Sequence, residues 1–248
     1  MKSVAVLFLI GYSCSLLGQL KVHSHNDYAQ EKPLYGALEA YAQSIEIDVI
    51  LKDKVLYVAH EVQSISPNKT LNTLYIDPLI QLISENDPRI ENLHLLIDIK
   101  TEAYASLNAI IEALIPLERL SYPAIEDGLR FVISGNRPAP KDYRTYPSHI
   151  LFDCQEIDKT PESSWSKVAM ISQSFRQFSN WDGSSDLTDE EIERIKSFII
   201  KAKTFEKPVR LWAVPDTPKA WQWTRSVGLD FINTDHPKEV RAFLEAQM

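Results

Sequence analysis

The stretch 20–61, LKVHSHNDYAQEKPLYGALEAYAQSIEIDVILKDKVLYVAHE, alternates apolar, strand-like runs with polar residues. A later run, LHLLIDIK at 93–100, has the same character. Carboxylates inside apolar runs are costly unless a partner or a cation neutralises them. The pattern therefore predicts strands whose ends converge on one charged site. Polar residues suited to acid, base or ligand chemistry lie at or near the ends of these runs, at His25, Glu46, Asp48, His60, Asp98 and Lys100.

Strand-like and helix-like segments alternate along the whole chain. Many strand candidates are continuous apolar runs, which is typical of strands buried on both faces in a parallel sheet under helices. We expect strands at 20–25, 44–50, 55–59, 93–99, 129–134, 149–153, 168–172, 209–213 and 229–233. We expect helices at 34–42, 77–85, 103–115, 188–205, 217–227 and 237–246. Setting 55–59 aside as an extra ribbon strand leaves eight strands, which predicts an α/β fold with a single (β/α)₈ TIM barrel.

The length and composition fit one globular domain after an N-terminal signal. The chain has 248 residues, of which 44% are hydrophobic and 24% charged. Barrels of this length often form a single domain. Lys2, the apolar run 4–11 and the small or polar residues after it match a secretory signal peptide. We therefore expect a signal peptide at 1–19, a barrel domain at 20–248, and a secreted or periplasmic protein.

The charge and hydropathy limit the partners. A formal net charge of −8 leaves no basic surplus to neutralise phosphates, so no nucleic-acid partner is expected. The N-terminal apolar run is shorter than the about 20 residues that cross a bilayer. No other stretch of the sequence is long and apolar enough, so stable membrane insertion is not expected. The sequence leaves the oligomeric state open.

Glu46 and Asp48 lie two residues apart in a strand candidate. Strand alternation puts both carboxylates on one face, with their α-carbon atoms about 7 Å apart. Asp98 on the next barrel strand can supply a third oxygen. Carboxylates with open positions suit Ca²⁺ or Mg²⁺ better than zinc. Acids paired with arginine or lysine are the alternative that such a short motif leaves open.

His25 and His60 each end an apolar run beside acidic residues. A histidine pair next to a cation suits phosphoryl transfer, with one ring as general base on an attacking hydroxyl and the other as general acid on the leaving oxygen. Lys100 would stabilise charge on the phosphate oxygens. A capping or hydrogen-bonded core histidine is the alternative for either residue alone. The order of the four motifs along the chain favours a site.

These motifs together resemble the glycerophosphodiester phosphodiesterase / phosphatidylinositol-phospholipase-C-like superfamily. That superfamily reads His-Arg-Gly, then a helix, then I-E-x-D-V, then a short β-ribbon ending in V-x-H-D, and later an acidic-x-Lys strand end. The tail of this chain, VRLWAVP at 209–215 and GLDFINTDHP at 228–237, resembles its closing strands. The matches bracket nearly all of 20–248. The HNDY form of the first motif, at 25–28, looks like a bacterial and fungal branch of the superfamily.

The resemblance implies a metal-dependent phosphodiesterase in which His25 and His60 form the acid–base pair, and the expected signal peptide makes it a secreted one. It implies a divalent metal, Ca²⁺ or Mg²⁺, on three carboxylates, and a small-molecule or lipid-head-group phosphodiester substrate held by neighbouring polar and aromatic side chains. The metal ligands would be Glu46, Asp48 and Asp98, and the substrate contacts would be Lys100, Asn26, His23 and Trp212.

The chain departs from the superfamily's pattern at two places. Asn26-Asp27 replaces the Arg-Gly that follows the first histidine, which removes a phosphate-binding arginine and leaves the class of phosphodiester open. Asp98 replaces the usual glutamate and gives the third ligand a shorter arm.

Two other functions remain as alternatives. His23-x-His25 on a first strand is also the signature of amidohydrolases and of polymerase-and-histidinol-phosphatase-like enzymes. Those enzymes need histidines at later strand ends, and the ends ILFDCQ and AMISQS have none. In our reading His23 is an extra ligand, a phosphate donor or a group behind the ligands. A barrel that kept its fold and lost its activity, serving as a binding module, is the second alternative.

Overall fold

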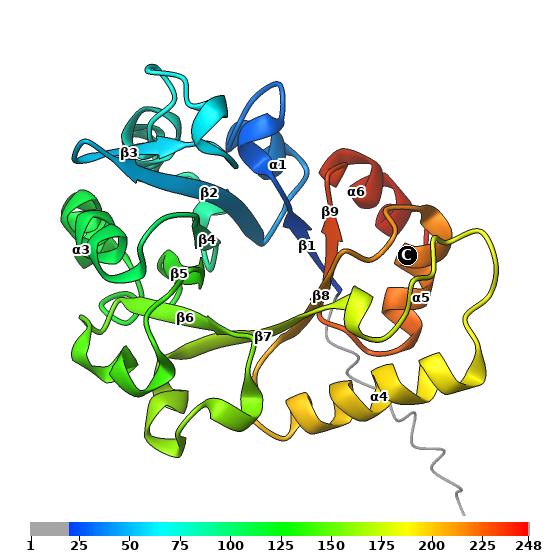
Figure 1. Cartoon of the computed structure of the whole chain (residues 1–248). Helices are drawn as coiled ribbons and strands as arrows, with labels where there is room; N and C mark the ends of the chain where they lie inside the picture. Colours follow the sequence, from blue (N-terminus) through cyan, green and yellow to red (C-terminus); the bar gives the residue numbers. More distant parts are fainter. Residues whose placement is uncertain (1–19, 248) are drawn as a thin grey trace, which may run out of the picture.

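A computed structural model describes residues 20–247, and the expected signal peptide at 1–19 lies outside the described residues. Eight parallel strands form the wall of a nearly closed barrel in the order β8-β7-β6-β5-β4-β2-β1-β9. Figure 1 looks along this barrel and shows helices on its outside. The strands are β1 (Lys21–Ser24), β2 (Ser44–Lys52), β4 (His94–Ile99), β5 (Arg130–Gly135), β6 (Ile150–Cys154), β7 (Val168–Ser174), β8 (Val209–Trp212) and β9 (Phe231–Thr234). The predicted single TIM barrel is confirmed.

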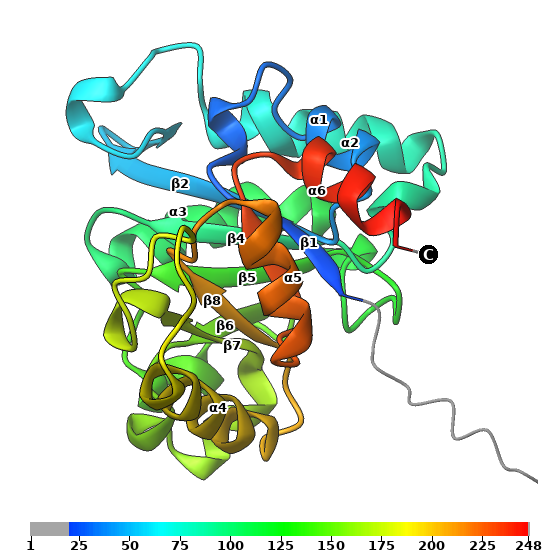
Figure 2. The ribbon, with the colours of Figure 1, turned by 90° about the vertical axis from the view of Figure 1, so that its right-hand side faces the viewer.

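The predicted ribbon strand is also confirmed. β3 (Val55–Val58) pairs with β2 in antiparallel fashion and lies off the barrel wall. Figure 2 shows this ribbon and the loop after it projecting from one end of the barrel. Asp53 and Lys54 form its turn with positive φ angles of 50° and 64°, the conformation that a two-residue hairpin of this twist requires. The ribbon extends β2 past the barrel mouth and carries the chain to His60.

Every predicted helix is present, with ends shifted by a few residues. A capping box at Thr188 and Glu191 begins the longest one, as its sequence indicates. Short 3₁₀ turns at Pro140–Thr145 and Glu162–Lys167 lie on the crossovers that follow β5 and β6. None of the helices in 20–247 is long and apolar enough to cross a membrane. The helices are α1 (Tyr35–Glu39), α2 (Asp77–Ser84), α3 (Ala103–Leu114), α4 (Asp189–Lys203), α5 (Pro218–Ser226) and α6 (Pro237–Glu245).

The inside of the barrel has two chemically different layers. Alternation along each strand sends one set of side chains toward the helices and the other toward the barrel axis. A buried apolar cluster fills the lower part of the interior, formed by Leu96, Val132, Leu151, Met170 and Phe231. Two residues further along the same strands come Asp98, Ser134, Asp153, Ser172 and Asn233, so the interior turns polar toward the carboxyl ends. Active sites of this fold form at that end.

In the part of the chain that the structure describes, the barrel wall closes between β8 and β9 without the backbone ladder that joins its other strands. Backbone ladders join the strands from β8 round to β9, whereas the residues described give no ladder between β8 and β9 themselves. A single backbone bond from Asp230 N to Val209 O, 3.0 Å long, joins them at their start. Further along, the Arg210 guanidinium donates to Asn233 Oδ1 at 3.1 Å. A side chain thus bridges this seam, and the same side chain belongs to the polar interior.

Candidate active site at the barrel mouth

Three carboxylates meet at the carboxyl end of the barrel. Glu46 and Asp48 come from one face of β2, and Asp98 on β4 is the direct register partner of Asp48. Each of the three residues offers an oxygen atom within 4.8 Å of those of the other two. The sequence predicted this triad, and the strand register brings it together.

Gly135 makes room for the third carboxylate. It ends β5 with φ at +66°, and a Cβ atom there would lie 2.2 Å from Asp98 Oδ1 and 2.6 Å from the Ile99 carbonyl oxygen. Contacts this short do not occur in folded proteins, and a positive φ strains any residue with a side chain. A glycine is therefore required for Asp98 to turn its carboxylate toward the triad.

The triad fits a hard divalent cation. Asp48 is buried, and among the described residues its Oδ1 atom has no hydrogen-bond partner. Lys100 Nζ lies 3.2 Å from that oxygen in an ion pair and 2.9 Å from Asp98 Oδ1. Burial, with the charges of Glu46 and Asp48 adding to it, outweighs the opposing effect of Lys100 and raises the pKa of Asp98 to about 6. A buried oxygen that has an ion-paired lysine but no hydrogen bond, beside excess negative charge, is what a cation would satisfy.

The charges around the triad support the same conclusion. Four carboxylates, Asp153 in the layer of Asp98 among them, face two cationic side chains, Lys100 and Arg210. Both ring nitrogens of buried His23 have polar partners, and burial together with Arg210 lowers its pKa to about 3, so the ring is neutral. Carboxylates that outnumber their cationic partners favour the binding of a divalent cation.

His60 stands at the rim of the barrel mouth. It follows β3, and its Nδ1 atom lies 2.6 Å from Asp48 Oδ2. The imidazole is 63% exposed, whereas the Asp48 side chain is 1% exposed. When Nδ1–H donates to a carboxylate, the Nε2 atom is left with its lone pair for a reacting group. The ribbon therefore presents an oriented imidazole to the solvent side of the carboxylate triad.

His25 lies on the other side of β2, after the neighbouring strand β1. Its Nδ1 atom lies 2.8 Å from Asp235 Oδ1 at the end of β9, while its Nε2 atom lies 3.7 Å from Glu46 Oε1. Burial lowers the pKa of His25, but the hydrogen bond to Asp235 and the charge of Glu46 outweigh it, so the pKa is raised. Asp235 follows β9 directly and is the partner of this ring.

The remaining residues of the HNDY motif have separate roles. Asn26 has a left-handed backbone with φ at 47°, and its amide nitrogen lies 3.0 Å from His25 Nδ1. Asp27 is fully buried and accepts from the Leu34 N–H and the Tyr75 hydroxyl at 2.6 and 2.8 Å. Tyr28 places its hydroxyl 2.8 Å from Asp48 Oδ2. Asp27 thus fixes the loop, and Asn26 and Tyr28 line the site. Sequence reasoning missed Tyr28.

Arg210 is the main residue that sequence reasoning missed. It is 2% exposed inside the barrel, and its guanidinium donates to Glu46 Oε2 at 2.6 Å and also contacts His23. Burial raises the pKa of Glu46, but Arg210 and His23 hold it well below its usual range. The signal was available, because a charged residue inside the apolar strand VRLW has the same desolvation cost that identified the carboxylates.

His23 and Trp212, both predicted to contact substrate, lie in contrasting places. His23 is fully buried, with Nδ1 2.7 Å from the Ser44 hydroxyl and Nε2 2.8 Å from Glu46 Oε2. A substrate contact would require the ring to leave these partners, so its placement here is behind the ligand Glu46. Trp212 ends β8 at the rim with 37% of its surface exposed. Its contact with substrate stays a prediction.

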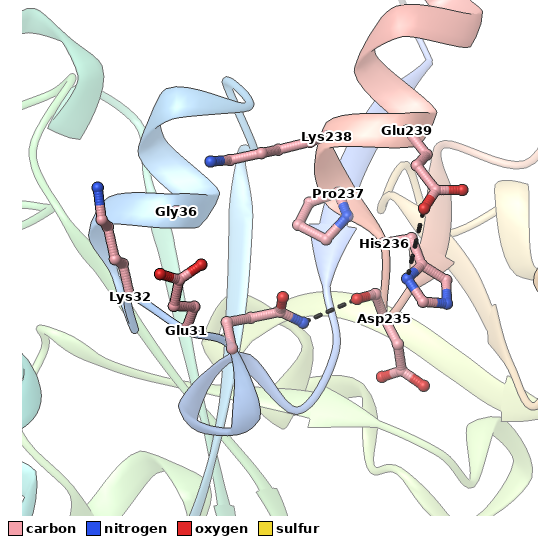
Figure 3. Close-up of a pocket in the computed structure, with 9 residues that line it drawn as sticks. Glu31, Lys32, Gly36, Asp235, His236, Pro237, Lys238 and Glu239 are labelled. Atoms are coloured by element: carbon pink, nitrogen blue, oxygen red, sulfur yellow. Dashed lines mark hydrogen bonds and ion pairs between the residues drawn. The ribbon is translucent and has the colours of Figure 1, made fainter.

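A cavity of about 280 Å³ lies beside the site, between the loop that follows β1 and the start of α6. Figure 3 shows Lys32, Lys238 and His236 around it, with the Asp235 carboxylate turned away from it. The cavity therefore shares the Asp235 backbone with the site but none of the triad.

Known proteins resemble this chain in sequence. The sequence model of the AIM6-like phosphodiesterase domain family matches residues 16–135. Altered inheritance of mitochondria protein 6 homolog from Arthroderma benhamiae is 26% identical over 90% of this chain and 83% of its own length. Altered inheritance of mitochondria protein 6 from Kluyveromyces lactis is 27% identical over 90% of this chain and 71% of its own length.

Solved structures share the fold. A glycerophosphodiester phosphodiesterase from Parabacteroides distasonis superposes with a TM-score of 0.63 at 17% identity, covering 92% of this chain and 98% of that one. A calcium-dependent phosphoinositol-specific phospholipase C from Pseudomonas gives a TM-score of 0.59 at 11% identity, covering 88% and 89%. These likenesses establish the fold, and the family match over residues 16–135 includes the triad and both histidines.

Proposed function

Because the resemblance to the glycerophosphodiester phosphodiesterase / phosphatidylinositol-phospholipase-C-like superfamily is confirmed by the family match and the fold, we propose that this chain is a metal-dependent phosphodiesterase. The observation that carries the proposal is the pairing of each histidine with its own aspartate, His25 with Asp235 and His60 with Asp48, next to one carboxylate triad. A core histidine needs no such arrangement, whereas an acid–base pair does.

The residues of the chain divide the reaction as follows. One imidazole takes the proton from the attacking hydroxyl through Nε2, and the other gives a proton to the leaving oxygen. Each aspartate holds its ring by Nδ1 and stabilises the charged form. Where the substrate carries a hydroxyl next to the phosphate, the attack is internal and gives a cyclic phosphate, and otherwise water attacks. Lys100 stabilises the charge on the phosphate oxygens.

The metal would be held by Glu46, Asp48 and Asp98, with Ca²⁺ or Mg²⁺ as the fitting ions. When bound, it would polarise the phosphate and lower the pKa of an attacking hydroxyl. The calcium dependence printed for the Pseudomonas phospholipase is consistent with this assignment. Arg210 and His23 keep Glu46 ionised and both bind its Oε2 atom, which leaves Oε1, 3.7 Å from His25 Nε2, outside these two hydrogen bonds.

The proposal extends to substrate and location. A soluble phosphodiester or a lipid head group is the substrate class, because the site lies at an open barrel mouth with one lysine and one exposed tryptophan. Neither nucleic acid nor a stably inserted membrane segment is part of the proposal. Secretion or periplasmic export follows from the predicted signal at 1–19.

The test uses the purified protein on a panel of phosphodiesters: glycerophosphocholine, glycerophosphoinositol, phosphatidylinositol in micelles, and bis(4-nitrophenyl) phosphate. Each is assayed with Ca²⁺, Mg²⁺, Mn²⁺, Zn²⁺ or a chelator. We expect turnover that chelation abolishes and that His60→Ala lowers by about 10²- to 10⁴-fold. His60 is mostly exposed, so its removal leaves the fold intact.

The matched control is His236→Ala. That imidazole is 55% exposed and lies 3.8 Å from a carboxylate of Glu239, yet it is outside the site. We expect its activity to equal that of the wild type. Activity indifferent to both chelation and His60→Ala would sink the proposal. Cleavage of amides or lactones in place of phosphodiesters would favour the amidohydrolase-like alternative.

A further inference from the structure

Asp235 has an exposed side chain on a strongly anchored backbone. Its carboxylate is 53% exposed, so little packing holds it against His25. Its N–H donates to Asp216 Oδ2 at 2.8 Å, and its carbonyl accepts from Gln30 Nε2 at 2.7 Å. Both polar backbone groups are therefore bound by side chains, and Figure 3 shows the carboxylate directed away from the neighbouring cavity.

Asp216 connects the start of α5 to the end of β9 through three hydrogen bonds. It precedes Thr217, the N-cap of α5. Its Oδ2 atom accepts from the Thr234 hydroxyl at 2.8 Å as well as from the Asp235 N–H. Its Oδ1 atom accepts from the Trp221 indole N–H at 2.6 Å, across the first turn of α5. All three partners are donors, so this position needs a side chain that accepts on both oxygens.

We propose that Asp216 is the positioning residue of the His25–Asp235 pair. By fixing the Thr234 side chain and the Asp235 backbone to the start of α5, it sets the carboxylate where it meets His25 Nδ1. Asp216 touches neither His25 nor the triad, and its role runs through Asp235. The inference rests on the proposed function for its catalytic consequence. Its structural part, the orientation of the His25 ring, stands independently.

Asp216→Asn tests the donor pattern with almost no change in shape. The amide nitrogen would face either the Trp221 indole N–H or the two donors on the Oδ2 side, and both arrangements set donor against donor. Trp221→Phe removes the indole donor. In the double variant the amide can turn its nitrogen toward Phe and keep its oxygen for Thr234 and Asp235. Rescue by this second change is specific to the proposed hydrogen bonds.

The kinetic experiment uses bis(4-nitrophenyl) phosphate and the full chain. We expect Asp216→Asn to lower kcat about tenfold or more with KM changed little, because a misplaced general base or acid costs rate. The double variant with Trp221→Phe should regain most of this loss. In an Asp235→Asn background, Asp216→Asn should cost nothing further, because its effect runs through the lost carboxylate. A multiplied loss in that background would overturn the inference.

Asp230→Asn is the matched control for stability. Asp230 lies at the opposite end of β9 and also accepts a backbone N–H, from Val209 at 2.5 Å. Its replacement should lower the free energy of unfolding by a similar amount and leave kcat unchanged in the folded protein. Equal loss of kcat in both variants would mean general destabilisation and would contradict the positioning role.

Long-range ¹H–¹⁵N correlation spectra of histidine-labelled, metal-free protein give a readout without turnover. At a pH above the raised pKa of His25, where its ring is neutral, we expect this ring, assigned with His25→Asn, to carry its proton on Nδ1 in the wild type and to lose this preference in Asp216→Asn. The double variant should restore it. An unchanged ring in Asp216→Asn overturns the inference. The expected spectra from a protein that cleaves no phosphodiester would refute the proposed function and leave the positioning role standing.

Discussion

The two histidine–aspartate pairs at the barrel mouth have opposite burial. On the β2–β3 side the carboxylate is the buried partner, because Asp48 is 1% exposed and His60 is 63% exposed. On the β1–β9 side the carboxylate is the exposed partner, because Asp235 is 53% exposed and His25 is 31% exposed. Two rings with the same predicted chemistry are thus held by different means.

Because of this difference, the two aspartates are held in place by different parts of the structure. Asp48 is fixed by the barrel wall and serves two purposes, since it belongs to the triad and orients His60. Asp235 pairs with His25, lies outside the triad and depends on loop contacts for its place. Damage on the β2 side should therefore affect metal binding and proton transfer together, whereas damage on the β9 side should affect proton transfer only.

The largest expected effect comes from Asp48→Asn. The change removes one carboxylate of the triad and weakens the acceptor of His60, so we expect activity to fall by about 10³-fold or more. The wild type should gain thermal stability when Ca²⁺ or Mg²⁺ is added, because a ligand that binds the folded state raises the Tm. The variant should lose this gain. Activity assays and thermal melts with and without the ion measure both effects.

Asp53→Asn is the control for that change. It removes the same charge from the same ribbon, but Asp53 lies in the exposed turn with φ at 50°, where asparagine is well tolerated. Activity and the metal-dependent gain in Tm should both match the wild type. If Asp48→Asn kept the full gain in Tm on addition of Ca²⁺ or Mg²⁺, Asp48 would not be a metal ligand. The proposed contrast between the His60–Asp48 and His25–Asp235 pairs would then be wrong.

Much of this comparison could be predicted from the sequence. Strand alternation put Glu46 and Asp48 on one face, and the rule that strand ends converge brought in His25, His60 and Asp98. These are local patterns in which desolvation cost marks the residue. The role of Asp235 could not be read in this way, because its partner lies 210 residues away and only barrel closure brings β9 beside β1.

Arg210 and Asp216 show two further limits. Arg210 lies in an apolar strand and could have been found by its cost, but its partner Glu46 depends on which strands face each other across the barrel. Asp216 lies in a polar turn before a helix, where aspartate is common for capping alone. Its three acceptor contacts depend on the packing of α5 against β9, which no local pattern encodes.

The next effect in size is expected from Gly135→Ala, which tests the β4 side of the triad. The added Cβ atom would lie 2.2 Å from Asp98 Oδ1, so the carboxylate must move. We expect metal affinity to fall by about 10- to 100-fold, as for other changes that displace a ligand. The free energy of unfolding should also fall by about 1–3 kcal/mol from the positive φ. Calorimetric titration with Ca²⁺ or Mg²⁺ and denaturant melts measure the two.

Gly228→Ala separates the two contributions. Gly228 also has a positive φ, at +80°, but its Cβ atom would have nothing within 4 Å in the described structure. It should lower stability by a similar amount and leave metal affinity unchanged. If both variants lost affinity equally, backbone strain and not the displaced Asp98 would be the cause.

The smallest expected effect concerns His94, a buried barrel histidine without an aspartate partner in the described structure, and the pH dependence of stability that it causes. His94 begins β4, is 8% exposed, and has no hydrogen-bond partner on Nδ1 among residues 20–247. Burial, with Arg130 and Lys21 adding to it, lowers its pKa to about 3, whereas the pKa of His25 is raised.

The unfolded chain binds a proton on His94 below about pH 6.5, and the folded chain does not. Stability should therefore fall as the pH drops below about 6.5, by up to about 1.4 kcal/mol per pH unit from this residue. In His94→Gln the acid limb should be shallower by this one proton, as measured by urea melts at pH 7, 6 and 5. His23, whose pKa is also about 3, keeps its own share of the slope. An unchanged slope in His94→Gln would mean that burial alone does not keep this ring neutral, and Asp235 would then no longer be what distinguishes His25 from His94.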